Sequence, residues 1–378
     1  MVWHERVCSL RISVYRLRTL SHVRVGSGEN IKIPSPIDNP QTRVLKLEPG
    51  KVEGKWMVYI PASSIHGVVR SSLENFLRST LEPWGTIDKF LHELQQQSED
   101  KKKNIDVKNV KKSISKYMDS VPGFNELPVY SEVCYTTIDF DSCKVPIRGE
   151  RELYHDIIGR YVKGGDGKAF YPCLVCQIFG ATGLRGRIRV TNAYPSKDMA
   201  ENLPLEVITR IAINRVTGAV EEARLFDLEA IPPGTEFYFA VIIDNHLEKI
   251  KFTGREDNQD RLKDSLKRLD YAQNNEVTYA RLFEAGLRMV GSGFVSIGAH
   301  GNVGFGSVEI SEVARLELVD GSDIKSYLSL LISENEAPEG LKSKVTAFEK
   351  DVNLSKLLIS DLYPLVVRKV ARLAGEQQ

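Results

Sequence analysis

Near the end of the chain, six glycines fall within sixteen residues, from Gly291 to Gly306. Glycine weakens helices and strands, and it occurs where φ is positive or where another backbone comes close. The segment is therefore expected to be a tight loop before the strand-like residues 307–310. Exposed backbone N–H groups suit phosphate binding, but the spacing matches neither the dinucleotide pattern nor the P-loop. A plain turn and a phosphate-binding loop both fit.

The first third of the chain predicts a strand and then a strand–turn–helix unit. Residues 7–25 alternate apolar and polar with period two, which is typical of a half-buried strand. Residues 56–77 pass from a strand through Pro61 into a helix, with Ser63 or Ser64 as the N-cap.

The later elements complete a mixed pattern. Strands are expected at 225–229 and 236–243, joined by a Pro-Pro-Gly turn, and helix over 257–290. Residues 204–214 are interpreted as a linker or short helix. This order predicts an α+β fold in which helices cover one face of an antiparallel sheet, with the ferredoxin-like split unit as the preferred topology.

Four regions are expected along the chain. Residues 1–83 would begin the ferredoxin-like part and 171–314 would complete it, while 84–170 form a helical, cysteine-bearing insertion and 315–378 a helical tail. Lysines at 101–116 fit either a solvated helix face or a phosphate-contacting patch.

Charge and cysteine content limit the class of protein. The 51 basic and 50 acidic side chains give a net charge of +1, so any site for a polyanion must be a local patch. The sequence has no apolar run of about 18 residues and no signal-peptide pattern, and its five cysteines are an odd number. We expect a cytoplasmic protein without a disulfide framework or membrane partner.

Two sets of polar residues are candidates for chemistry or binding. Asp38 lies in a loop stiffened by three prolines, where it could be a metal ligand, a general base or a simple turn residue. Arg185, Arg187 and Arg189 would share one face of a strand, suited to phosphates or to ion pairs on a solvated sheet.

The pair Cys173 and Cys176 has the C-x-x-C spacing of half a tetrahedral zinc site. Candidates for the other half are His155, Cys143 and Cys134, and buried free thiols or a redox pair remain alternatives. No histidine falls in a known metal spacing and no nucleophile motif is present, which argues against conventional nucleophilic hydrolysis.

Four segments form one combined pattern: Ile60–Arg70, Cys173–Gly180 with Arg187–Ala193, Ile213–Phe237 and the terminal glycine loop. Together they resemble the RAMP superfamily of CRISPR-associated proteins, and most closely the repeated backbone subunit of type III (Csm/Cmr-like) interference complexes. The resemblance covers residues 7–75 and 170–310. Within Ile60–Arg70, Ala62 replaces the family's glycine and His66 its lysine.

The resemblance implies a ferredoxin-like (RRM-like) palm, a lid that often carries zinc, and a thumb hairpin at about 213–237. It also implies the partners: a CRISPR guide RNA, complementary target RNA, other RAMP subunits and further copies of the chain. The thumb would lie across the guide–target duplex and displace a base at intervals.

The same resemblance assigns the site residues. Asp38 takes the position of the catalytic aspartate, which would coordinate Mg²⁺ or act as a base while target RNA is cut. Alternatives are a structural RAMP subunit that does not cut, and a guide-processing endoribonuclease using His22 or His66. The implied RNA-binding residues are His22, Ser63, Ser64, His66, Arg70, Arg185, Arg187, Arg189, Arg215, Gly298, His300, Gly301 and Gly304, and the implied zinc ligands are Cys173, Cys176, His155 and Cys143.

Overall fold

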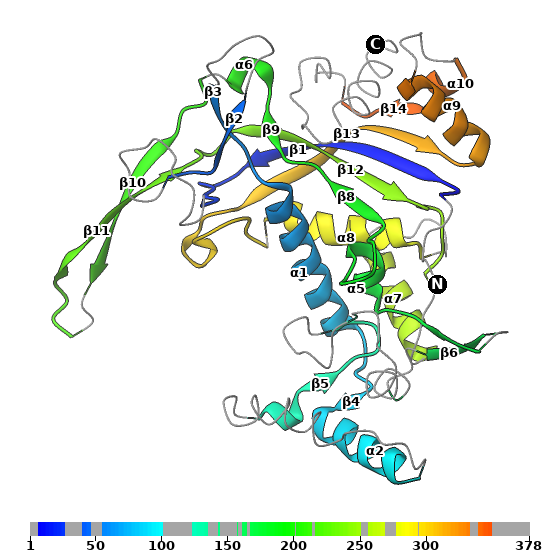
Figure 1. Cartoon of the computed structure of the whole chain (residues 1–378). Coiled ribbons are helices and arrows are strands. Elements are labelled where there is room, and N and C mark those ends of the chain that lie inside the picture. Colours follow the sequence, from blue (N-terminus) through cyan, green and yellow to red (C-terminus); the bar gives the residue numbers. More distant parts are fainter. Residues whose placement is uncertain are drawn as a thin grey trace. The chain divides into compact units, whose positions relative to one another are not determined.

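The chain divides into two compact units (Figure 1). Unit 1 comprises Met1–Arg6, Leu73–Ile188 and Leu247–Ala285, and unit 2 comprises Val7–Ser72, Arg189–His246 and Gly286–Gln378. The structure is a computed structural model, and it describes residues 7–26, 40–46, 55–100, 123–134, 143, 157, 161–164, 167–200, 202–213, 216–250, 256–268, 277–293, 295–332 and 339–349.

A six-stranded sheet forms the centre of unit 2. Its strand order is β14-β13-β1-β12-β8, and β9 also pairs with β12. β1 pairs antiparallel with both β12 and β13, so the predicted α+β class with an antiparallel sheet is confirmed. The strands are β1 (Leu10–Thr19), β8 (Ile188–Val190), β9 (Tyr194–Pro195), β12 (Glu236–Asp244), β13 (Val308–Leu318) and β14 (Val345–Ala347).

Strand β1 is buried on both faces over residues 11–15, rather than half-buried as its alternating pattern predicted, whereas Arg16 and Arg18 are partly or fully exposed. On one face Ile12 and Val14 belong to a core cluster of the sheet. On the other face the ring of Tyr15 stacks on Phe239 at 5.4 Å. The polar Ser13 is buried with them. A central strand covered on both sides buries its polar positions as well, so period two alone could not distinguish the two cases.

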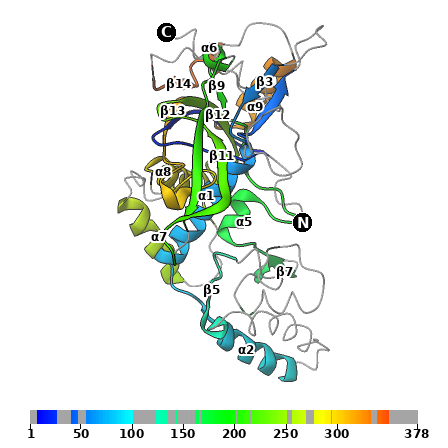
Figure 2. The same ribbon diagram turned by 90° about the vertical axis from the view of Figure 1, so that its left-hand side faces the viewer.

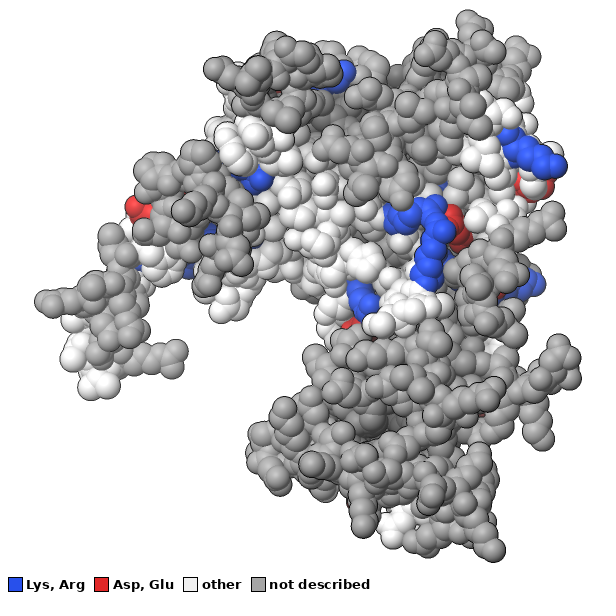
Figure 3. Space-filling view, in the orientation of Figure 1, with Lys and Arg blue, Asp and Glu red and all other residues white. Residues whose placement is uncertain are grey.

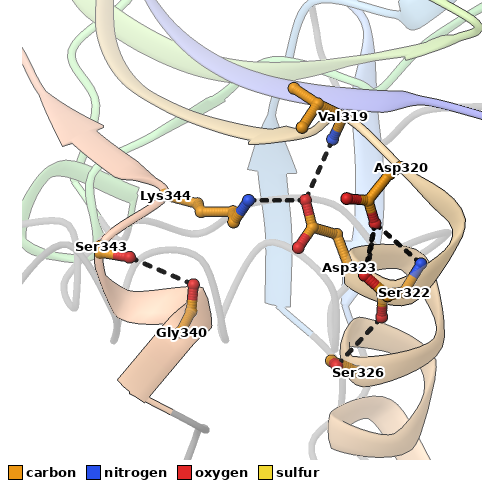
Figure 4. A network of polar contacts seen from close by, with 8 residues as sticks. All are labelled: Val319, Asp320, Ser322, Asp323, Ser326, Gly340, Ser343 and Lys344. Atoms are coloured by element: carbon orange, nitrogen blue, oxygen red, sulfur yellow. Dashed lines mark hydrogen bonds and ion pairs between the residues drawn. The ribbon is translucent and has the colours of Figure 1, made fainter.

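The residues after β13 fold onto the sheet instead of forming only a helical tail. Helices α9 (Gly321–Ile332) and α10 (Glu339–Lys342) precede the edge strand β14, and Tyr327 and Leu341 join the same core cluster as Ile12. Figure 4 shows the polar contacts that hold this region, including Lys344 Nζ to Asp323 Oδ2 at 2.7 Å. The prediction of a wholly helical tail was wrong at β14, which is a strand, and residues 350–378 lie outside the described part.

Two helices connect strands of this sheet. α1 (Ala62–Thr80) lies between β1 and β8 in the sequence, and α8 (Tyr279–Gly291) between β12 and β13. Each runs from one unit into the other. The N–H of Ile65 bonds to the Pro61 carbonyl, and that of Ala62 to Asn192 Oδ1 at 2.8 Å. Neither predicted serine is therefore the N-cap, because the helix begins one residue before them.

A long hairpin of β10 (Glu206–Ile213) and β11 (Val220–Ala230) belongs to unit 2 and extends away from the sheet in Figure 1. The interpretation of 204–214 as linker or helix was wrong. Cross-strand pairing with 220–230 determines its conformation, which a local pattern does not reveal. A shorter hairpin of β2 (Arg43–Lys46) and β3 (Lys55–Val58) is held by an ion pair from Arg43 to Glu229 at 2.8 Å.

Unit 1 contains the end of α1, small two-stranded sheets and short helices. The predicted helical stretch at 257–290 is confirmed at α7 and α8, but residues 277–278 are not helical and Thr278 forms a β-bridge with Lys249. Figures 1 and 2 show α2 beside β4 and β5. No helix of the described residues is both long and apolar enough to cross a membrane. The elements are β4 (Gly85–Thr86), α2 (Ile87–Asp100), η1 (Phe124–Glu126), β5 (Pro128–Val129), β6 (Tyr161–Gly164), β7 (Gly167–Phe170), α5 (Leu174–Phe179) and α7 (Glu256–Arg268).

His246 makes unit 2 sensitive to acid. Its side chain is 3% exposed, and neither ring nitrogen has a hydrogen-bond partner among the described residues. Burial, and then the charges of Arg11 and Arg315, lower its pKa to about 4. Glu317 forms ion pairs with both arginines, and Glu312 forms one with Arg315. The folded protein thus favours the neutral imidazole.

Stability is therefore expected to be full above about pH 6.5, where His246 is neutral in both states, and to fall as the pH drops toward 4. The loss attributable to this side chain is about 2 kcal/mol, allowing for solvent screening. Urea unfolding of His246→Phe between pH 7 and 4 should show a flatter profile than wild type. A matched change at the exposed His92 should leave the profile as it is, and equal slopes for wild type and His246→Phe would contradict the assignment.

Candidate nucleic-acid interface and cysteine cluster

The glycine loop of unit 2 pairs with the segment that follows β1. Gly306 N–H bonds to the His22 carbonyl at 2.7 Å, and Ala299 N–H bonds to the Arg24 carbonyl at 2.8 Å. Two segments almost 280 residues apart in the sequence are thus joined through their backbones. Side chains from both segments gather at this junction.

The junction depends on glycines at two positions. Gly298 has φ +85, and a Cβ there would lie 2.2 Å from the Arg24 carbonyl oxygen. Gly306 also has φ +85, and its Cβ would lie 2.4 Å from the carbonyl oxygen of Ile297. Both the backbone conformation and the close approach exclude a side chain. The conformation and the close packing of the loop therefore explain these two glycines. From the sequence alone, a plain turn and a phosphate-binding loop were both possible explanations.

Phe305, within this loop, is surrounded by polar side chains. The Arg210 guanidinium lies 4.8 Å from the ring centroid. The rings of His22 and His300 lie 5.6 and 5.9 Å from it. His22 Nε2 is 2.6 Å from Glu206 Oε2. These five residues and Arg24 are called the Phe305 cluster.

The two arginines of the cluster form no ion pair with a described residue. Arg24 Nε and Arg210 Nε are buried without a hydrogen-bond partner, and the described part of the chain shows no ion pair for either side chain. Burial lowers the pKa of Arg24, although arginine stays charged. Burial, and then the charges of Arg24 and Arg210, lower the pKa of His300. Such a concentration of cationic donors favours an anionic ligand.

The hairpin holds Arg210 in place. Glu206, Ile208 and Arg210 alternate along β10 and so share one face. Ile208 packs on the cluster of Leu228, Ala230 and Phe305. The base of the hairpin is thereby anchored on the glycine loop. Arg210 lies in the segment that the sequence pattern predicts to be a linker or short helix.

The predicted arginine face is largely used inside the protein. Arg187 is 2% exposed, with Nη1 2.6 Å from Glu248 Oε2 and its guanidinium 4.2 Å from the Tyr279 ring centroid. Arg189 forms a two-fold bond with Asp244 at 2.6 and 2.7 Å. Arg185 is exposed and precedes the strand, which begins at residue 188. Figure 3 shows one face of the molecule, where the described Lys and Arg side chains lie in separate patches, several of them beside acidic side chains.

The other predicted RNA-binding residues lie on two elements or outside the described part. Ser63, Ser64, His66 and Arg70 occupy the first turns of α1. Gly301 is the first residue of the short η3 turn (Gly301–Val303) of the glycine loop, and Gly304 directly follows it. Asp38, Arg215 and His155 lie outside the described residues.

Sequence reasoning missed Arg24, Glu206, Arg210 and Phe305. A usable signal existed for Arg24, which alternates with His22 after the first strand. Phe305 stands between two glycines, where an aromatic ring needs a packing partner. No local signal marks Glu206 or Arg210, because pairing with β11 brings them to the loop.

Unit 1 contains a buried cluster of four cysteines. The sulfur atoms of Cys134, Cys143, Cys173 and Cys176 all lie within 4.8 Å of one another. Those of Cys134 and Cys176 are 3.5 Å apart. Zinc bonded to four thiolates at about 2.3 Å requires sulfurs about 3.8 Å apart. The cluster therefore fits a tetrahedral zinc site, with Cys134 beside three of the predicted ligands.

Local hydrogen bonds orient these sulfurs. Cys173 N–H points to Cys143 Sγ at 3.2 Å, and Cys176 N–H to Cys173 Sγ at 3.4 Å. Hydrogen bonding with Cys134, then with Cys143 and Cys173, and burial raise the pKa of the Cys176 thiol. A bound dication would reverse this effect, since it stabilises thiolates.

The end of α1 is tied to the same cluster. Arg78 Nη2 donates to the Cys134 carbonyl at 3.1 Å, and Tyr130 Oη donates to the Arg78 carbonyl at 3.1 Å. The cluster thus links the helix to two loop segments and α5.

One protein family matches the chain. The model of the RAMP superfamily matches residues 16–309, which is more than half of the 378 residues. The chain belongs to the RAMP superfamily, and is thus of a CRISPR-associated, RNA-binding type. A search of curated proteins found no match.

Proposed function

We propose that the protein is a guide-RNA-binding backbone subunit of a type III CRISPR effector complex, acting in the cytoplasm. It would bind the guide through its sugar–phosphate backbone, because base pairing carries the sequence information in such complexes. The observation that carries this proposal is the Phe305 cluster, in which Arg24 and Arg210 lack anionic partners among the described residues. Family membership points to the same ligand class.

In this proposal the parts of the chain have distinct tasks. The order β1, α1, β8, β12, α8, β13 with the sheet order β13-β1-β12-β8 supports a ferredoxin-like palm. The β10–β11 hairpin would be the thumb that lies across the guide–target duplex. Further copies and other RAMP subunits would assemble along the guide. Arg185, Arg215 and the first turns of α1 would add contacts, whereas Arg187 and Arg189 would have to exchange their present carboxylate partners to do so.

The four-cysteine cluster would hold structural zinc in the lid. Zinc would supply a cross-link between chain segments there and no chemistry. Cys134, Cys143, Cys173 and Cys176 would be its ligands.

Cleavage of the target would depend on Asp38 and a divalent metal, Mg²⁺ above all. The ends of its loop are fixed beside the Phe305 cluster. Gly26 and Gln41 form an antiparallel bridge, and Val25 N–H bonds to Gln41 Oε1 at 3.0 Å. A carboxylate in such a loop could orient a metal at the phosphate that the cluster binds.

A second candidate function is metal-independent processing of guide RNA. The observation that favours it is the short contact between His22 and Glu206, since an oriented imidazole is a general acid or base. This candidate predicts cutting of repeat RNA in EDTA that is lost in His22→Ala. Retention of cutting in that variant, or a need for metal, would exclude His22 in this role.

Binding is tested with the two arginines. Arg24→Ala/Arg210→Ala is expected to weaken guide RNA binding about 10- to 100-fold and to reduce the slope of log K against log salt by about 1.4. Fluorescence anisotropy of the full chain at several salt concentrations measures both quantities. The Lys–Lys version keeps the charge and should retain most of the salt slope.

A surface arginine serves as the matched control. Arg261 pairs with Glu82 at 3.1 Å in unit 1, so Arg261→Ala should bind RNA as wild type does. If Arg261→Ala weakens binding as much as the double variant, the Phe305 cluster is not the RNA site.

A further inference from the structure

Glu206 is the one acidic member of the Phe305 cluster. Its side chain is on the face of β10 that also carries Arg210, and it is 54% exposed. A carboxylate repels phosphate, so beside a phosphate site it lowers affinity unless the ligand also offers a donor. A ligand that carries both an anionic group and a hydrogen-bond donor would therefore fit this position best.

Only part of the carboxylate is used within the protein. Glu206 Oε2 contacts His22 Nε2 at 2.6 Å. The described part of the chain shows no ion pair between Glu206 and either Arg24 or Arg210, although Arg210 shares its strand face. An ionised carboxylate offers about four acceptor positions. Because the side chain is about half exposed, a ligand can reach the acceptor positions that His22 does not use, and His22 fixes the orientation of the group.

The backbone of RNA has one hydrogen-bond donor, the ribose 2′-hydroxyl, because phosphate and ring oxygens only accept. DNA lacks this donor. Base edges also carry N–H groups, but a contact that must tolerate any guide sequence cannot depend on one base. The 2′-hydroxyl is thus the group that matches an acceptor next to phosphate-binding arginines.

We propose that Glu206 accepts a hydrogen bond from a ribose 2′-hydroxyl and makes the Phe305 cluster selective for RNA over DNA. The assignment rests on the proposed RNA-binding function. Arg24 and Arg210 bind the phosphate. His22 positions the carboxylate of Glu206, which distinguishes ribose from deoxyribose by accepting the hydrogen bond of the 2′-hydroxyl. Glu206 would raise the affinity for RNA through this hydrogen bond, and it would also lower the affinity for DNA, whose phosphates repel the carboxylate and whose sugar has no hydroxyl donor.

The test compares three single strands of one sequence: RNA, 2′-O-methyl RNA and DNA. Anisotropy with the full-length wild-type protein is expected to show RNA binding about 10- to 100-fold tighter than DNA, the range for a hydrogen bond to a charged group. The 2′-O-methyl strand keeps the sugar conformation but has no donor, so it should bind like DNA. Glu206→Gln keeps an acceptor for His22 and removes the charge.

In Glu206→Gln the RNA-to-DNA ratio is expected to fall to within about threefold, partly because DNA binds more tightly once the repulsion is gone. Asp227→Asn is the matched control, since Asp227 contacts Thr209 on the other face of the same hairpin. It should keep the wild-type ratio.

The outcomes separate the two proposals. RNA binding that is normal but shows no preference over DNA, or a preference that survives in Glu206→Gln, overturns the role of Glu206 and leaves the RNA-binding function standing. Absence of RNA binding, or binding insensitive to Arg24→Ala/Arg210→Ala, overturns the function itself. A loss of preference equal in Asp227→Asn would also overturn the assignment, because it would make the effect one of general charge.

Discussion

Replacing Cys176 by serine is expected to remove bound zinc and to destabilise unit 1 by several kcal/mol. The four sulfurs come from residues up to 42 positions apart, 134 and 176, and they are held within 4.8 Å of one another. Binding free energy at a structural zinc site is largely folding free energy, about 10–16 kcal/mol for isolated zinc-finger peptides. The loss of one of four ligands should therefore lower the free energy of unfolding by more than an average point mutation does, which is about 1 kcal/mol.

Zinc content by mass spectrometry and urea unfolding measure the two parts of this prediction. Purified wild type should contain about one zinc per chain, a strong chelator should lower its stability, and added zinc should restore it. Cobalt in place of zinc should give the thiolate charge-transfer absorption, which Cys176→Ser should weaken. These signals do not depend on any activity.

Cys8 provides the matched control, because it is the one cysteine of the five that lies outside the cluster, and it is exposed. Cys8→Ser should keep the zinc and the stability of wild type. Two results together would contradict the prediction: wild-type protein without bound metal, and equal stability of Cys176→Ser and Cys8→Ser. They would mean that the cluster consists of free thiols.

The sequence supported the elements that local patterns determine. Alternation marked β1, helical spacing marked α7 and α8, and the C-x-x-C spacing pointed to half of the cysteine cluster. For the other half the sequence offered His155, Cys143 and Cys134 as candidates, and the fold was needed to show that Cys134 and Cys143 both join the cluster, because they stand in irregular segments. Their approach to Cys173 is fixed by backbone contacts such as that from Leu174 N–H to the Glu132 carbonyl at 2.9 Å.

The Phe305 cluster shows the same limit more sharply. The glycine run predicted a loop, but not that its backbone would bond to His22 and Arg24. Arg210 was invisible as a site residue because its strand is defined by pairing with β11 rather than by its own pattern. Arg187 was the opposite case. Its spacing suggested an exposed face, but its side chain is buried, where it pairs with Glu248 and lies over the ring of Tyr279.

Replacing Asp38 by alanine is expected to abolish metal-dependent cutting of target RNA while leaving guide binding intact. Removing a group that orients a metal or accepts a proton at the reacting phosphate lowers a rate by about 10²- to 10⁴-fold. The full chain is assembled on a guide with its partner subunits, and a labelled complementary RNA is followed in Mg²⁺ or in EDTA. Regularly spaced cuts are expected only for wild type with metal.

The matched control is Asp264→Ala, a carboxylate on α7 that pairs with Lys267 on the surface of the helix. It should cut like wild type. Cuts that persist in Asp38→Ala would contradict the assignment, and cuts that persist in EDTA would favour the histidine-dependent candidate. Target binding without cuts in wild type would identify a structural subunit.

Binding and cutting should separate because they use different parts of the junction. Arg24 and the backbone of the glycine loop are held by hydrogen bonds between residues 22–24 and 299–306. Asp38 belongs to the loop that leaves at Gly26 and returns before Gln41, which pair with each other independently of that residue. Asp38→Ala should thus keep wild-type RNA affinity and lose cutting, whereas Arg24→Ala/Arg210→Ala should lose both. Equal loss of affinity in the two variants would show that Asp38 supports the loop rather than the reaction.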